Sequence, residues 1–227
     1  MELRDYQVAD LAFYMSHPRC ANFSDPGTGK TPSVCVYIHY LWDEEQVRTI
    51  WAMPKSLCKK NFRELMTWSE FEEGDVALVG GSPARRTKIM QTDAKVFIMG
   101  FDCFARNWRE LVGYHPDIDC FVGDEWHMGF KGANSQRTGS LFEFMERTYR
   151  LVAMTGTIID GRLDTAYPLI ELCAPGHYVG GHDGFLMAHA IEDGYGRVVA
   201  WRDPQSRRSW RQSGHPPRSR RLRPRRS

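Results

Sequence analysis

The segment Ser24-Asp25-Pro26-Gly27-Thr28-Gly29-Lys30-Thr31 constrains the fold of this chain more than any other feature. It follows a short strand-like run, residues 20–23, and precedes an amphipathic run that predicts a helix through Leu41. A phosphate chain needs converging backbone N–H groups, glycines that allow close approach, and the partial positive charge of a helix N-terminus. The segment therefore predicts a phosphate-binding loop between a strand and a helix.

Each side chain of this loop has an expected role. Lys30 would reach the β- and γ-phosphates of ATP, and the Thr31 hydroxyl would bind Mg²⁺. Ser24 stands where the simplest pattern has its first glycine, so the match rests on Gly-Lys-Thr and the inner glycines. The alternative is a glycine-rich turn without a ligand, and the flanking strand and helix favour the nucleotide site. The predicted nucleotide-binding residues of the loop are Pro26, Gly27, Thr28, Gly29, Lys30 and Thr31.

A second motif, Phe121-Val122-Gly123-Asp124-Glu125-Trp126-His127, lies about ninety residues downstream. Its apolar run predicts a strand that ends in two acids, at the edge of a sheet where ligands of α/β domains bind. We expect Asp124 to hold Mg²⁺, generally through water, and Glu125 to polarise the attacking water. Alone, these acids would more often begin a surface loop. Together with the upstream loop, they predict Lys30, Asp124 and Glu125 as catalytic residues, with ATP and Mg²⁺ as cofactors.

Short, continuously apolar runs separated by helical patterns predict the fold class. Such runs are typical of strands that are covered on both faces, as in a parallel sheet. We therefore predict an α/β, doubly wound, mostly parallel sheet over residues 1–174. Residues 175–201 predict an irregular connector that ends in a hairpin around residues 193–201. The expected strands are residues 47–53, 76–79, 96–99, 120–122 and 151–154.

The basic residues are unevenly distributed. Residues 202–227 contain ten arginines and one acid, so the preceding residues hold 20 basic and 27 acidic side chains, a formal charge of −7. The overall charge of +2 is therefore no evidence that the whole chain binds nucleic acid. The Arg/Ser/Pro-rich tail predicts disorder. We favour a reading-frame change as its origin over a natural tail that grips phosphates.

Cysteine spacing and hydropathy exclude other classes. The six cysteines form no C-x-x-C pair, and we expect them to be reduced core residues. No run approaches the 18 or so apolar residues of a membrane helix, so we expect no membrane partner. Without a recognisable leader, a cytoplasmic location is expected, and a viral or prokaryotic setting is compatible with it.

The order of the motifs resembles the first RecA-like lobe of superfamily 2 helicases and translocases, in particular the Swi/Snf-like branch. Residues 124–127 are similar to the D-E-x-H box, and residues 153–157 contain the T-G-T motif. The resemblance spans about residues 3–172, and the ordered series makes it specific. The matching segments are Leu3-Arg4-Asp5-Tyr6-Gln7, Pro54-Lys55-Ser56-Leu57 with Asn61-Phe62, Gly100-Phe101-Asp102, Asp124-Glu125-Trp126-His127 and Ala153-Met154-Thr155-Gly156-Thr157.

This resemblance implies further roles. Gln7 would read the adenine edge with Arg4 beside it, and Lys55 with Ser56 would contact the nucleic-acid backbone, of which double-stranded DNA is the expected form. Trp68, Trp108 and Trp126 are interpreted as core or interface aromatics without a functional role. The residues expected to couple hydrolysis to movement are His127, Thr155, Gly156 and Thr157.

The resemblance also implies a second RecA-like lobe that supplies arginine fingers. About fifty residues follow Leu172, too few for such a lobe, so we expect it not to be encoded here. The sequence thus predicts the ATP-binding lobe of a DNA-dependent ATPase that moves on DNA. Two alternatives stay open: a truncated, non-catalytic module that binds ATP and DNA, and a small-molecule P-loop kinase.

Overall fold

The computed structural model describes residues 2–25, 27–157 and 163–202, and its centre is a six-stranded parallel sheet. The strand order is β1-β6-β5-β2-β4-β3, and every neighbouring pair runs parallel. This confirms the predicted doubly wound α/β class. The strands are β1 (Arg19–Asn22), β2 (Arg48–Met53), β3 (Val76–Val79), β4 (Val96–Gly100), β5 (Ile118–Asp124) and β6 (Arg150–Met154).

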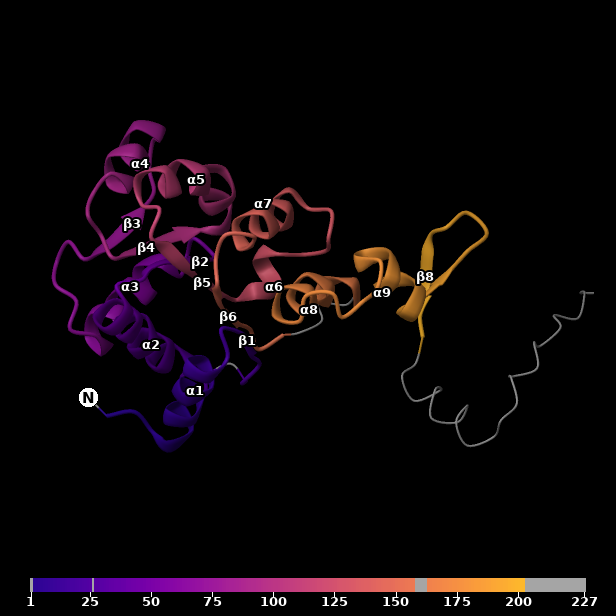
Figure 1. Cartoon of the computed structure of the whole chain (residues 1–227), viewed down its shortest axis with the longest axis horizontal. Helices are drawn as coiled ribbons and strands as arrows, with labels where there is room; N and C mark the ends of the chain where they lie inside the picture. Colours follow the sequence, from indigo (N-terminus) through magenta and orange to yellow (C-terminus); the bar gives the residue numbers. More distant parts are fainter. Residues whose placement is uncertain (1, 26, 158–162, 203–227) are drawn as a thin grey trace, which may run out of the picture.

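Helices cover both faces of the sheet (Figure 1). One face is covered by α1 (Asp5–Ser16), α2 (Lys30–Glu45) and α3 (Cys58–Trp68). The other is covered by α4 (Pro83–Met90), α5 (Phe101–Tyr114), the short α6 (Trp126–Gly129), α7 (Gln136–Met145) and α8 (Tyr167–Cys173). Among the described residues, no helix combines the length and apolar character needed to cross a membrane.

The two-sided cover explains the continuous apolar runs. Successive strand side chains point to opposite faces. In β2, Ile50 and Ala52 therefore pack into the core beneath α5 and α7, whereas Trp51 and Met53 pack into the core beneath α2 and α3. All four side chains are fully buried, so each position of this central strand must be apolar.

Cysteines contribute to these cores as expected. Cys20, Cys35 and Cys120 are buried, and the other three are half-buried. Burial raises the pKa of the Cys20 and Cys120 thiols to about 12, which keeps them protonated at neutral pH. A protonated, buried thiol behaves as a small apolar side chain.

The described part of the connector differs from the prediction. The hairpin is confirmed, with β7 (Ala190–Glu192) antiparallel to β8 (Val198–Trp201). The segment before it, predicted to be irregular, contains the helix α9 (Gly181–His189). Tertiary packing explains the difference, because the buried Phe185 of α9 contacts the rings of Tyr167 and Tyr178. The predicted disordered tail lies outside the described residues except for Arg202, and the proposed domain limits remain predictions.

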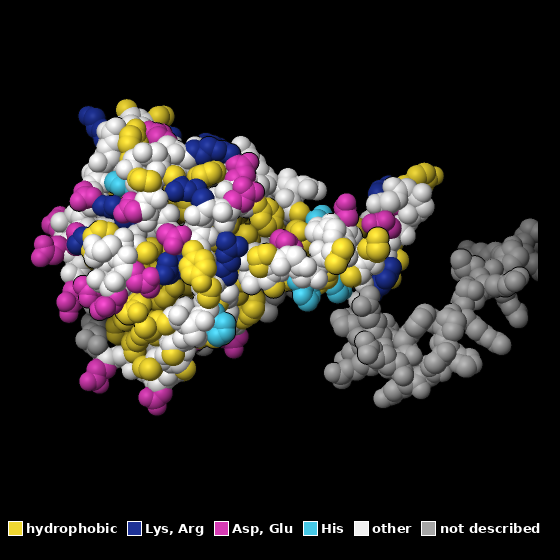
Figure 2. Space-filling model, in the orientation of Figure 1, with side chains coloured by type: hydrophobic (Ala, Val, Ile, Leu, Met, Phe, Trp, Pro, Cys, Tyr) yellow, Lys and Arg dark blue, Asp and Glu magenta, His cyan; other side chains and the backbone are white. Residues whose placement is uncertain are grey.

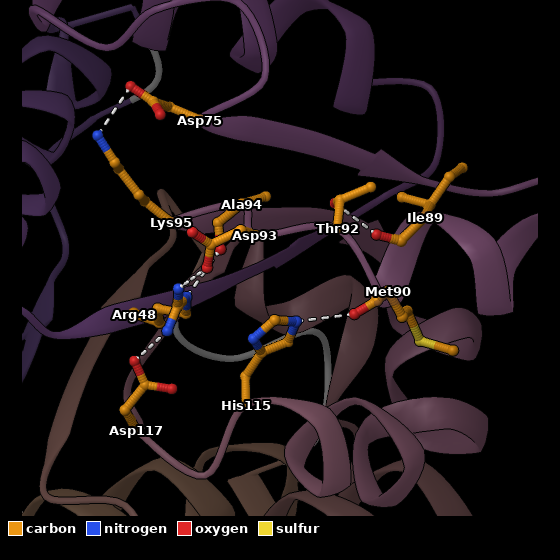
Figure 3. Close-up of polar contacts among 10 residues, drawn as sticks. All are labelled: Arg48, Asp75, Ile89, Met90, Thr92, Asp93, Ala94, Lys95, His115 and Asp117. Atoms are coloured by element: carbon orange, nitrogen blue, oxygen red, sulfur yellow. Dashed lines mark hydrogen bonds and ion pairs between the residues drawn. The ribbon is translucent and has the colours of Figure 1, made fainter.

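Arg48 ties together the amino-terminal ends of three strands (Figure 3). Its guanidinium pairs with Asp93, which precedes β4, and with Asp117, which precedes β5, and its Nε donates to the Ala94 carbonyl at 3.0 Å. The Arg48 side chain is only 13% exposed. A guanidinium that satisfies its partners in this fork geometry fixes their separation. These bonds hold the amino-terminal ends of three strands together at one edge of the sheet. The predicted ligand-binding motifs follow the carboxyl ends of the strands, at the opposite edge.

Gly129 has a packing requirement that can be tested. A Cβ at this position would lie 2.6 Å from Cε1 of the Phe101 ring, whereas a Cβ at the exposed Gly113 of α5 would meet nothing within 4 Å. We expect Gly129→Ala to destabilise the fold by about 1–3 kcal/mol through overpacking. Gly113→Ala should instead stabilise it by about 0.5–1 kcal/mol. Urea denaturation of both variants checks this, and equal effects of one sign would contradict the packing.

Candidate nucleotide and nucleic-acid site

The carboxyl ends of the parallel strands place the predicted motifs at one edge of the sheet. Asn22 at the end of β1 and Asp124 at the end of β5 both lie opposite Met154 of β6. The loop after β1, the acids after β5 and the Thr155 segment after β6 are therefore neighbours. Parallel α/β sheets bind their ligands at this edge.

The loop after β1 leads directly into the N-terminus of α2. Asn22 orders its start, since its side-chain oxygen accepts a bond from the Ser24 N–H at 2.9 Å and its Nδ2 donates to the Tyr14 hydroxyl at 2.6 Å. Gly29 is the N-cap of α2 with φ 80°, a left-handed conformation that favours glycine. The 16-residue α2 has no acidic residue in its first turn, so its N-terminal N–H groups and positive dipole end suit a phosphate.

Lys30 is folded back onto the loop. Its ammonium donates to the carbonyl oxygen of Ser24 at 2.5 Å and to that of Asp25 at 3.0 Å. Phosphate oxygens are stronger acceptors than these carbonyls, so a bound triphosphate would replace them. Thr31 is the second residue of α2, which puts it beside Lys30 at the same helix end. Pro26 lies outside the described residues.

Gln7 connects α1 to the loop. Its side chain is 4% exposed; Oε1 accepts the Arg4 N–H at 2.9 Å, and Nε2 donates to the Gly29 carbonyl at 2.8 Å. A Cβ on Gly29 would lie 2.9 Å from that nitrogen. Arg4 is the N-cap of α1, and its guanidinium donates to the Tyr6 hydroxyl at 3.3 Å. Gln7 thus contacts the loop with Arg4 beside it, and the adenine contact of both residues stays a prediction.

An open cavity of about 480 Å³ adjoins this contact. It is lined by Arg4, Tyr6 and Gln7, by the loop glycines and by Trp68 at the end of α3. Trp68, which was predicted to be a core or interface aromatic without a functional role, therefore lines a cavity beside the loop. Only the packing of α3 against α2 brings it to the loop, and no local pattern signals that contact.

Asp124 is a partly buried carboxylate with two defined donors. Its Oδ2 accepts from Nδ2 of Asn61 at 2.7 Å, and its Oδ1 accepts from the Glu125 N–H at 3.0 Å. Burial raises the pKa of Asp124, the Glu125 charge adds to the increase, and the Asn61 bond and the Lys30 charge oppose it. A divalent cation would compensate this desolvation, and oxygen donors such as Asp124 and the Thr31 hydroxyl are those that Mg²⁺ prefers. The residues therefore fit the expected metal.

Glu125 adopts a strained backbone conformation. Its φ of 50° and ψ of 50° are left-handed, which is uncommon for a residue other than glycine. The conformation turns the chain between β5 and α6, and the Glu125 side chain remains 37% exposed. Strain of this kind concentrates at functional sites.

His127 contacts Thr155, with which the resemblance groups it among the expected coupling residues. Nδ1 of His127 lies 2.8 Å from the Thr155 hydroxyl and 3.6 Å from Oε2 of Glu125. The Thr155 hydroxyl donates its proton to the Thr157 carbonyl at 2.8 Å, so Nδ1 of His127 must be the donor to Thr155. Gly156 lies between the two threonines. The contact is present, and its coupling role stays a prediction.

Lys55 and Ser56 are exposed at the carboxyl end of β2, beside a basic cavity of about 650 Å³. The cavity is lined by five basic side chains and one acidic side chain, Asp102. Only Lys55 of the five was predicted from the sequence. The other four lie on α3, α4, α5 and α7, which the order of the strands in the sheet brings together. The basic side chains are Lys55, Lys59, Arg86, Arg106 and Arg137.

The helix α3 begins at Cys58, two residues after Ser56. The Leu57 N–H donates to the Pro54 carbonyl at 2.9 Å, which closes a turn over residues 54–57. Lys55 and Ser56 therefore lie on an exposed turn in front of α3, and not in its first helical turn.

The fold is similar to the RecA-like α/β lobes of solved helicase and SWI2/SNF2 ATPase structures. Neither a comparison with protein-family models nor one with curated proteins finds a match. Among solved structures, the chain is similar to the SWI2/SNF2 ATPase core of Sulfolobus solfataricus in complex with dsDNA, with a TM-score of 0.65, 19% identity, and coverage of 83% of this chain and 39% of that one.

Two further structures share the fold. The Hef helicase domain of Pyrococcus furiosus matches with a TM-score of 0.62 and 20% identity, over 77% of this chain and 37% of that one. The UvsW helicase of bacteriophage T4 matches with a TM-score of 0.60 and 15% identity, over 74% of this chain and 57% of that one. The chain thus spans less than two thirds of each of these proteins.

The raised pKa of Asp124 predicts a stability change. The folded state holds the Asp124 proton more strongly than the unfolded state does. The protein therefore loses stability as pH rises from the unfolded-state pKa of 3.8 through the raised folded-state pKa. Asp124→Asn cannot ionise, so its Tm relative to that of the wild type should rise as pH increases from about 4 to 7.

Calorimetry of the metal-free protein measures this effect. Asp193→Asn is the control, because bonds from Arg197 and Tyr195 lower the pKa of Asp193 and give the opposite sign. A Tm difference between Asp124→Asn and the wild type that does not shift in favour of the variant as pH rises from about 4 to 7 would contradict the effect of burial.

Proposed function

We propose that this chain is the ATP-binding lobe of a DNA-dependent ATPase similar to Swi/Snf translocases, which hydrolyses ATP to drive movement on double-stranded DNA. One observation carries the proposal: Lys30, the Asp124–Glu125 pair and the His127–Thr155 contact lie at one edge of a helicase-like sheet. The similarity to a SWI2/SNF2 core in complex with dsDNA supports the DNA part.

In the proposed mechanism, bound ATP with Mg²⁺ supplies the phosphoryl group and a neutralising cation. Lys30 exchanges its two loop carbonyls for phosphate oxygens. The Thr31 hydroxyl and the Asp124 carboxylate would hold the metal, and Glu125 would accept a proton from the water that attacks the γ-phosphate. His127 lies between Glu125 and Thr155, where it would relay the state of the site to the segment after β6.

A whole motor needs more than this lobe. The chain spans 39% of the SWI2/SNF2 core, and we propose that a second RecA-like lobe completes the site with arginine fingers. The second candidate function is a module that binds ATP and DNA without turnover. A small-molecule kinase is less well supported, because it would have no use for the His127–Thr155 contact.

Two substitutions separate ATP binding from hydrolysis. Lys30→Ala should weaken ATP binding about ten- to hundredfold, because it removes charge-assisted bonds to phosphate. Glu125→Gln should bind ATP normally and lose DNA-stimulated phosphate release. Fluorescent-nucleotide titration and a phosphate-release assay measure these effects, with the exposed Lys88→Ala of α4 as a control.

The outcome selects among the candidates. Equal phosphate release by wild type and Glu125→Gln would favour the non-catalytic module. Phosphate transfer to a metabolite without a response to DNA would favour a kinase. Unchanged ATP affinity in Lys30→Ala would exclude the proposed nucleotide site.

The basic cavity predicts where DNA phosphates bind. On the face shown in Figure 2, acidic and basic side chains are interspersed. The lining of the cavity differs, because it has five basic side chains and one acidic side chain. Lys59→Ala and Arg106→Ala should each weaken duplex binding and reduce the slope of log K against log salt by about 1. Lys88→Ala, outside the cavity, should change neither.

Fluorescence anisotropy over a salt series measures these slopes. Because every variant keeps the arginine-rich tail, a difference in slope reports on the cavity alone. Unchanged slopes in both cavity variants would contradict binding at this surface.

A further inference from the structure

Asn61 is a buried side chain with an unusual set of partners. It lies on α3 and is 2% exposed. Its Nδ2 donates to Oδ2 of Asp124 at 2.7 Å and lies 3.3 Å from the Met53 sulfur. Both contacts are at the carboxyl ends of strands, since Met53 ends β2 and Asp124 ends β5. The Asn61 amide therefore bridges the helix to two strands at the edge where the site lies.

The bond to Asn61 defines how the Asp124 carboxylate is held. The Glu125 N–H donates to one carboxylate oxygen at 3.0 Å, and Asn61 donates to the other at 2.7 Å. Two donors, one on each oxygen, fix both the position and the plane of the group. A donor behind a metal-binding carboxylate orients it and tunes its affinity for the ion.

Asn61 is also joined to the nucleic-acid side of the molecule by a short, continuous piece of backbone. The turn at Lys55 and Ser56 leads into α3, where the Asn61 N–H donates to the Leu57 carbonyl at 2.9 Å. Lys59, two residues before Asn61, lines the basic cavity. Lys59 and Asn61 thus lie in the same first turns of α3, directly after the turn that carries Lys55 and Ser56.

We propose that Asn61 is a positioning residue that orients Asp124 for the metal and transmits phosphate contacts at Lys55 and Lys59 to that carboxylate. The inference rests on the proposed function, and it assigns Asn61 to the metal side although the resemblance groups it with a nucleic-acid motif. A phosphate that draws the turn outward shifts α3 and with it the bond to Oδ2 of Asp124. The coupling is reciprocal, so nucleotide with metal also changes the affinity for DNA.

The test compares Asn61→Leu and Asn61→Ser with the wild-type full chain. Leucine has a similar size and removes the hydrogen-bond donor. Serine also removes the bond, because its hydroxyl is too short to reach Asp124, and it provides a second variant if Asn61→Leu does not fold. Thr148→Val is the matched control, because Thr148 is also 2% exposed and bonds the Phe144 carbonyl at 3.0 Å, among residues outside the site.

Three affinities are measured: ATP without metal, Mn²⁺ in the presence of ATP by electron paramagnetic resonance, and duplex DNA with and without Mn²⁺ and ATP. We expect both Asn61 variants to bind Mn²⁺ at least about tenfold more weakly, the loss typical of a removed outer-shell partner. Metal-free ATP and nucleotide-free DNA should bind unchanged, and the effect of Mn²⁺ and ATP on DNA affinity should disappear. In an Asp124→Asn background, Asn61→Leu should cause no further loss of Mn²⁺ affinity.

A folded Asn61 variant with wild-type Mn²⁺ affinity, or one that retains the wild-type linkage between Mn²⁺·ATP and DNA, would overturn the inference. Failure of the proposed function is distinguishable, because it is read from the wild type alone, as a lack of ATP binding, of DNA binding or of DNA-stimulated phosphate release. A similar loss in Thr148→Val would show a general loss of stability and would also overturn the inference.

Discussion

The parallel direction of all six strands is the constraint on which the site depends. It gathers every amino-terminal strand end at one edge and every carboxyl-terminal end at the other. Arg48 and its acidic partners join strand ends at the first edge. The loops at the second edge carry Lys30, the Asp124–Glu125 pair and Thr155. If β1, β5 or β6 ran antiparallel, the group at its carboxyl end would lie at the opposite edge of the sheet, about one strand length away from the others.

Much of the α/β body follows from local sequence. Strands buried on both faces must be apolar at every position, and β2 and β4 were predictable for that reason. The contact of His127 with Thr155 was predictable from motif order. Features set by long-range packing were not: the helix α9 depends on Phe185, and the approach of Trp68 to the loop depends on how α3 packs.

In this molecule the positions of the charged side chains say more about binding than the net charge does. The residues before 202 carry a formal charge of −7, yet five cationic side chains converge on one cavity from five segments. Their convergence requires β2, β4 and β3 to be neighbours. Composition therefore points away from nucleic acid, whereas topology builds a local surface suited to phosphates.

The left-handed backbone of Glu125 has a consequence for how this protein can change. Glycine or asparagine at this position would relieve the strain, so selection for stability alone favours replacing Glu125. Selection for activity favours the carboxylate. Under the proposed function, variants that no longer need to hydrolyse ATP should therefore change first at position 125, whereas variants that still hydrolyse ATP should keep Glu125.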